Sequence, residues 1–132
     1  MVSSLQSRTF TDIDMNFGKH PMSGDIRKKT GDDAIKQAIR NLILTQPYER
    51  PFHPEISSSV RQMLFENISP LTAISIARSI REVLLNFEPR IKLHKVTVRA
   101  DSDNNGYEAS IMFWLLNVEE PVIINEFLHR LR

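Results

Sequence analysis

The stretch Asn86-Phe87-Glu88-Pro89-Arg90-Ile91 joins the longest helical pattern of the chain to the first strand of a predicted hairpin. Proline lacks an N–H and disfavours the α-conformation of the residue before it, so Pro89 ends the helix. Glu88 therefore lies at the negative end of the helix dipole, where a carboxylate is disfavoured. Two interpretations follow: Arg90 pairs locally with Glu88, or the two charged side chains form a docking fork for a partner.

The segment before this corner predicts the main helix. Ser69 is expected to cap it, and Pro70 suits the first helical position. Apolar residues then recur at helical spacing on one stripe: Ala73, Ile76, Ala77, Ile80, Val83, Leu84 and Phe87. The solvated side is predicted to carry Ser75, Arg78, Ser79, Glu82 and Asn86.

The segment after the corner predicts a β-hairpin. His94, Val96, Val98 and Ala100 alternate with polar residues, and 101–106 is rich in the Asn, Asp and Gly that hairpin turns need. The return strand over 107–116 has one apolar face, made by Tyr107, Ala109, Ile111, Phe113 and Leu115. Its other face becomes apolar at Met112, Trp114 and Leu116, and a strand that is apolar on both faces needs cover on both. We therefore predict that Met112 and Trp114, or the C-terminal segment over them, lie at or near an inter-subunit surface; the alternative is that the C-terminal segment covers them within the monomer.

The remaining segments complete an α+β pattern. We expect a helix from near Thr30 to Pro47, a proline-bounded connection over 48–54, and a short helix over 58–67 that buries Val60, Leu64 and Phe65. Residues 119–132 fit either a helix or a third strand that contains Ile123 and Ile124. Residues 1–29 are expected to form an extended arm, to which residues 10–13 can add a short strand. The predicted fold is one α+β domain over 30–132, a small antiparallel sheet (the hairpin and a possible C-terminal strand) packed on about three helices.

Composition narrows the function. The chain has 132 residues, 41% of them hydrophobic, a formal net charge of +1 and no cysteine. A length of this order suits one domain with one core. The charge does not indicate nucleic acid or an anionic membrane as a partner, and the absence of cysteine excludes disulfides and thiolate metal sites. We see neither a signal peptide nor a stretch of membrane length.

The sequence contains few residue patterns that indicate catalysis. It lacks a glycine-rich phosphate loop, and His20, His53, His94 and His129 have no metal-ligand spacing, so we expect no cofactor and no metal. A pair of carboxylates for glycoside hydrolysis is the one enzymatic arrangement to weigh. Glu82 and Glu88 are the candidates, with Glu66 and Asp101 behind them. A carboxylate on the wet face of a helix usually serves solubility, so we favour a protein without catalytic residues.

Three blocks of sequence carry a family resemblance: Arg50-Pro51-Phe52-His53-Pro54-Glu55, then residues 64–72 (LFENISPLT), then the corner at 86–91. In order and in spacing they resemble the baseplate wedge proteins, or sheath initiators, of contractile-tailed phages, which have a counterpart in type VI secretion baseplates. The resemblance covers about residues 48–91. His53 stands where the family usually has an aspartate, which puts a role for that side chain in doubt.

The resemblance implies that the protein has a role in assembly and lies in the tail baseplate of the virion. It also implies that the protein is made in the host cytoplasm. Family members are expected in six copies per particle, around the tail tube. Glu88, Pro89 and Arg90 would dock on the helical core bundle of neighbouring wedge proteins, and the sheet would template the first ring of the tail sheath protein by strand addition. Met112, Trp114, Ile123 and Ile124 are the candidate sheath-facing residues. On this view Arg90→Glu abolishes incorporation and leaves the fold intact. The family also carries a lysozyme-like label, so a virion-associated muramidase acting on host peptidoglycan is the alternative.

Overall fold

The computed structural model describes residues 11–13, 28–116 and 118–131, and the chain forms two compact units, 1–38 and 39–132. In the first unit, β1 (Thr11–Ile13) pairs antiparallel with β2 (Lys28–Thr30). Helix α1 (Asp32–Leu44) begins here and continues into the second unit. It starts two residues later than predicted from Thr30, because Gly31 adopts the left-handed conformation (φ +63°) that glycine permits and so separates β2 from α1.

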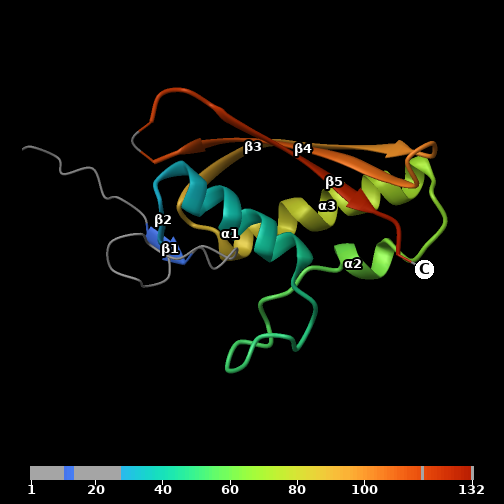
Figure 1. Ribbon diagram of the computed structural model, residues 1–132, viewed down its shortest axis with the longest axis horizontal. Coiled ribbons are helices and arrows are strands. Elements are labelled where there is room, and N and C mark those ends of the chain that lie inside the picture. Colours follow the sequence, from blue (N-terminus) through green and yellow to red (C-terminus); the bar gives the residue numbers. More distant parts are fainter. Residues whose placement is uncertain (1–10, 14–27, 117, 132) are drawn as a thin grey trace, which may run out of the picture. The chain divides into compact units, whose positions relative to one another are not determined.

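The second unit contains a three-stranded antiparallel sheet. Its strands are β3 (Ile91–Asp101), β4 (Gly106–Leu115) and β5 (Val122–His129), with β4 in the centre. The segment that the sequence left open between helix and strand is therefore a strand. Helix α3 (Pro70–Phe87) packs along β3, and the four-residue α2 (Val60–Met63) packs against α3. In Figure 1 the helices of this unit lie on one side of the sheet, which confirms the predicted α+β fold.

Helix α3 follows its sequence pattern closely. The Ser69 hydroxyl accepts a hydrogen bond from the Thr72 N–H at 3.1 Å, so the predicted cap is present, and Pro70 occupies the first turn. The apolar stripe is buried, except that Ala77 and Phe87 are half-buried. Ser79 corrects the prediction of a wet side, because it is buried and its hydroxyl lies 2.8 Å from that of Ser59. The buried arc of the helix thus includes two polar residues, Thr72 and Ser79, beside its apolar stripe.

The core lies between α3 and the inner face of the sheet. Every residue predicted for the inner face of β4 is buried, and β5 adds Ile124 and Leu128. The predicted alternation of β3 fails at His94, because the register shifts between Leu93 and Lys95. This β-bulge lets Leu93 face Phe113 and Val96 face Ile111, so both sides of the bulge keep an apolar inner face.

The segment before α3 is less helical than predicted. Side-chain and backbone bonds hold it instead: the Ser58 hydroxyl donates to the Ile43 carbonyl, and the Ser58 N–H donates to the Thr45 carbonyl at 3.0 Å. These bonds keep 58–59 out of a helix, and α2 is one turn long. Val60 and Leu64 are buried as predicted, but Phe65 is 56% exposed, because the chain leaves the helix at Leu64.

Candidate functional site

The corner at Glu88 is a closed ion pair. Arg90 Nε donates to Glu88 Oε1 at 2.6 Å, and a terminal guanidinium nitrogen donates to Oε2 at 2.8 Å. The Glu88 side chain is 3% exposed and that of Arg90 25% exposed. A bidentate pair of this kind is geometrically specific and stronger than a neutral hydrogen bond. Local pairing, one of the two interpretations of the corner, is therefore present, and it accounts for a carboxylate at a helix C-terminus.

The backbone holds the corner at both ends. The Glu88 N–H donates to the Leu84 carbonyl at 3.1 Å, which closes the last turn of α3, and the Arg90 carbonyl accepts from Leu116 N–H at 3.5 Å. Pro89 between them is exposed. The corner therefore presents Pro89 and the flank of Arg90 at the surface, while the Glu88 carboxylate faces inward.

The candidate carboxylates do not form a catalytic pair. Glu88 is buried against Arg90, whereas Glu82 and Glu66 are exposed. The side chain and the backbone N–H of Asn104 both donate to the Asp101 carboxylate and lower its pKa. A general acid needs a raised pKa. The pKa of Glu55 is also lowered, by a backbone hydrogen bond and by His53, whose ring nitrogen lies 3.1 Å from it.

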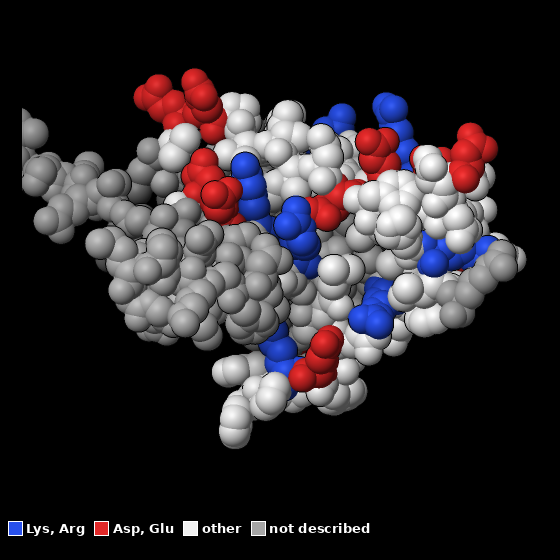
Figure 2. Space-filling model, in the orientation of Figure 1, with Lys and Arg blue, Asp and Glu red and all other residues white. Residues whose placement is uncertain are grey.

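Two other kinds of site are absent from the described part of the chain. No group of three or more His, Asp or Glu side chains there is arranged to hold a metal ion. No helix within 28–116 is long and apolar enough to cross a membrane. Figure 2 shows acidic and basic side chains interspersed over the face that it presents, without a single large patch of one sign.

In the part of the chain that the structure describes, no strand pairs with the outer edge of β5, so this strand edge is open there. Arg130 N–H donates to the Asn105 carbonyl at 2.9 Å, and bonded pairs in an antiparallel ladder recur every second residue. Counting along the ladder in steps of two from this pair, Ile124 and Ile111 are also a hydrogen-bonded pair. It follows that the peptide groups of Ile123, Asn125, Phe127 and His129 point away from β4, toward the open edge.

The edge of β3 is different in kind. It carries the bulge at His94 and the charged side chains of Lys92, Lys95 and Arg99. Bulges and edge lysines are the means by which proteins discourage strand addition. Within residues 91–129, β5 is therefore the edge better suited to receive a strand.

The predicted sheath-facing residues divide between two faces of the sheet. Met112 and Trp114 are half-buried on the outer face, where Ile123 lies opposite Met112 and is 51% exposed. The His94 ring meets Trp114 edge-on, with centroids 4.8 Å apart. The C-terminal segment pairs beside β4, and Ile124 is buried on the inner face, so the Ile124 side chain belongs to the core.

The loop between α1 and α2 holds a feature that the sequence reasoning missed. Tyr48 and Phe52 have φ of +63° and +67°, and they are 85% and 96% exposed. Non-glycine residues rarely adopt this conformation, and such strain clusters at functional sites. The prolines around them predicted an extended loop but carried no signal for left-handed aromatic residues.

Comparison with known proteins places these surfaces in context. Residues 29–116 match the family model described as baseplate wedge protein gp25. The chain is 35% identical over 116 residues to the baseplate wedge protein gp25 of Enterobacteria phage T4, covering 88% of this chain and 87% of that protein. The family resemblance drawn from the three sequence blocks is thus confirmed.

Solved structures share the fold. A chain in the anti-feeding prophage baseplate superposes with a TM-score of 0.70 at 26% identity, covering 85% of this chain and 90% of that one. A putative tail lysozyme from Geobacter sulfurreducens gives a TM-score of 0.61 at 23% identity, covering 74% and 90%. A chain of the pyocin R2 postcontracted baseplate gives 0.53 at 23% identity, covering 83% and 96%.

Proposed function

The chain belongs to the baseplate wedge protein gp25 family, and we propose that it is fixed in a contractile-tail baseplate by its Glu88–Arg90 corner and starts the sheath by accepting a strand on β5. Its partners would be the helical core bundle of neighbouring wedge proteins, the tail sheath protein and the tail tube. The open edge of β5 is the observation that carries this proposal.

Strand addition is favoured by the chemistry of that edge. The outward peptide groups of β5 offer a row of donors and acceptors, and an incoming strand gains affinity by bonding to them. Ile123 and Phe127 alternate along the outer face and add apolar area. An open strand edge with apolar flanks promotes aggregation of the isolated protein. In an assembled particle a partner strand would cover the same edge.

A proline on the open edge tests this proposal. Asn125→Pro removes an N–H that points outward, so the β4–β5 ladder keeps its bonds while the edge loses a donor and gains a steric block. Ala100→Pro is the matched control on β3, because Ala100 pairs with Tyr107, whose peptide groups are directed to β5. We expect Asn125→Pro to stop sheath assembly on purified baseplates and Ala100→Pro to leave it normal. Normal sheath assembly with Asn125→Pro would refute strand addition on β5.

The docking role of the corner needs a variant that leaves the ion pair in place. Pro89 is exposed between the two charged residues, so Pro89→Glu changes the surface charge of the corner and retains Glu88 and Arg90. Pro121→Glu is the matched control at another exposed proline. We expect Pro89→Glu to fold and to be excluded from wedges, and Pro121→Glu to be incorporated. Incorporation of Pro89→Glu at the level of the unmodified protein would refute docking through the corner.

The muramidase alternative makes a different prediction. The buried Glu88 carboxylate accepts two guanidinium hydrogen bonds, so it is poorly placed to protonate a glycosidic oxygen. We expect the purified chain to leave peptidoglycan suspensions turbid. Clearance that disappears with Glu82→Gln or Glu88→Gln would show a hydrolase instead.

A further inference from the structure

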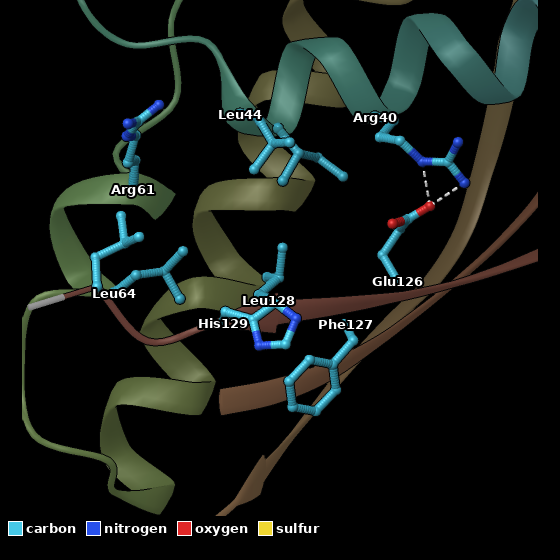
Figure 3. Close-up of a pocket in the computed structure, with 10 residues that line it drawn as sticks. Arg40, Leu44, Arg61, Leu64, Glu126, Phe127, Leu128 and His129 are labelled. Atoms are coloured by element: carbon cyan, nitrogen blue, oxygen red, sulfur yellow. Dashed lines mark hydrogen bonds and ion pairs between the residues drawn. The ribbon is translucent and has the colours of Figure 1, made fainter. Parts of the chain in front are cut away.

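A cavity of about 290 Å³ lies beside β5. Four successive β5 residues, Glu126 to His129, line it together with the end of α1 and with α2 (Figure 3). Successive side chains of a strand point to opposite faces, so a pocket that only one face borders would be lined by alternate residues. A pocket lined by four in a row opens onto the edge of the strand. The cavity therefore adjoins the position that an added strand would occupy.

Leucine and isoleucine side chains from the helices, from β5 and from the residues after each form an apolar wall of the cavity. Leu44, Leu64 and Leu128 extend into a common space in Figure 3, and Ile43 and Leu131 complete this wall. Leu64 and Leu128 are buried, whereas Leu44 at the end of α1 is 42% exposed. An apolar side chain so exposed, at the mouth of an apolar cavity, can gain further burial when a partner arrives.

The charges around the cavity are asymmetric. At one end Arg40 is paired with Glu126. At the other end Arg61 is exposed, and no hydrogen bond or ion pair involves its guanidinium within residues 28–131 as the structure describes them. An acidic group on an incoming chain could therefore pair with Arg61. The carboxylate of Glu126 would not repel it strongly, because Arg40 already pairs with Glu126.

The size of the cavity indicates side chains rather than a cofactor. Sites for small molecules usually enclose about 300–1,000 Å³, and this one lies just below that range. A dry cavity of about 150 Å³ already holds a benzene molecule. About 290 Å³ therefore accommodates one or two aliphatic side chains of a bound strand.

We propose that this cavity selects the strand that adds to β5: an extended segment of the tail sheath protein places an aliphatic side chain between Leu44, Leu64 and Leu128, and an acidic residue of the same segment pairs with Arg61. The inference rests on the proposed function, since it presupposes that β5 receives a strand. Backbone bonds would give the affinity common to any strand, and the cavity would supply the sequence preference.

Binding of the tail sheath protein of the same particle to five variants of the full chain tests this proposal. Leu44→Gln makes the cavity mouth polar, and Leu71→Gln is its control, because Leu71 is 74% exposed on α3. Arg61→Glu reverses the charge at the rim, and Arg78→Glu is the control at an exposed arginine of α3. Asn125→Pro blocks the edge itself. Thermal denaturation of each variant verifies its fold.

We expect about a tenfold loss of affinity from Leu44→Gln, the equivalent of about 1.4 kcal/mol, and a loss of several fold from Arg61→Glu. The two α3 controls should bind within twofold of the unmodified chain. Methyl signals of Leu44, Leu64 and Leu128 in a methyl-labelled sample should shift when the sheath protein binds.

The outcomes separate the two proposals. If Asn125→Pro binds normally, strand addition on β5 is wrong, and the cavity inference is overturned with it. If Asn125→Pro abolishes binding but Leu44→Gln and Arg61→Glu bind normally and the leucine methyl signals stay in place, the strand adds without entering the cavity. That result overturns the inference and leaves the proposed function standing.

Discussion

Replacing Arg90 by glutamine should destabilise the fold by about 2–3 kcal/mol, although the Arg90 side chain is partly exposed. The reason is the Glu88 carboxylate, which is 3% exposed and receives both guanidinium bonds. Removing one partner of a buried ion pair costs about 3–5 kcal/mol, because the other charge stays buried without compensation. Arg90 is 25% exposed, so water can reach part of the site after the substitution, and we expect the cost to fall below this range, to about 2–3 kcal/mol.

The penalty should be asymmetric between the two partners. Glu88→Gln leaves a guanidinium that can turn to water, so we expect it to cost about 1 kcal/mol, the value of an ordinary hydrogen bond. Glu88→Gln combined with Arg90→Gln leaves no buried charge and should be more stable than Arg90→Gln alone. Arg78→Gln, at an exposed arginine of α3, should change stability by less than about 0.5 kcal/mol.

Urea denaturation of the four variants measures these differences directly, since the midpoint shifts with stability at constant slope. If Arg90→Gln costs no more than Arg78→Gln, or if the double variant is less stable than Arg90→Gln, the Glu88 carboxylate does not depend on Arg90 for its burial. The sequence alone led us to expect that Arg90→Glu would leave the fold intact. With Glu88 buried beside it, a second carboxylate would repel the first, so we now expect that variant to lose stability before it can report on docking.

Three further predictions concern the loop, the hairpin and its turn. Phe52→Asn should raise the free energy of unfolding by about 0.5–1 kcal/mol in the same assay, because the residue is 96% exposed at φ +67° and Asn tolerates this conformation better than Phe; a loss of stability would show that Phe52 makes contacts that the structure does not have. Gly106→Ala should lower the melting temperature by several degrees, since a methyl there would lie 2.5 Å from the Leu128 carbonyl oxygen; an unchanged melting temperature would contradict the close β4–β5 approach. The hydrogen bonds from Asn104 lower the pKa of Asp101, so they stabilise the turn fully above the ordinary aspartate pKa, and this stabilisation is lost as pH falls below that value through the lowered pKa of the folded state. Asp101→Ala should flatten the acid limb of the stability curve, and an unaltered limb would contradict a stabilising role of these hydrogen bonds.

Much of the fold was readable because it depends on local patterns. The apolar stripe of α3, its Ser69 cap and the inner face of β4 each follow from residue spacing and from the burial that spacing requires. The stop at Pro89 is a property of proline itself. Residues close together in the sequence determine these elements, so contacts with distant residues did not change the predicted secondary structure.

The remainder depends on contacts between distant residues. Residues 119–132 fitted both a helix and a strand, and β4 settled the matter by pairing with β5. The bulge at His94 cannot be recognised from the sequence of β3, because apolar residues occur at odd positions before it (Leu93) and at even positions after it (Val96). The buried Ser79 depends on Ser59, twenty residues earlier. The cavity needs α1, α2 and β5 together, and no local pattern predicts it.

Amide hydrogen exchange measures directly whether β5 accepts a strand of the tail sheath protein. The measurement compares the chain alone with the chain bound to the sheath protein, at the four outward amides of Ile123, Asn125, Phe127 and His129. We expect these amides to exchange fast in the free chain and to be strongly protected in the complex, while Ile124 and Leu128, already bonded to β4, change little. Binding of the sheath protein without protection of the four outward amides would show that the strand does not add to β5.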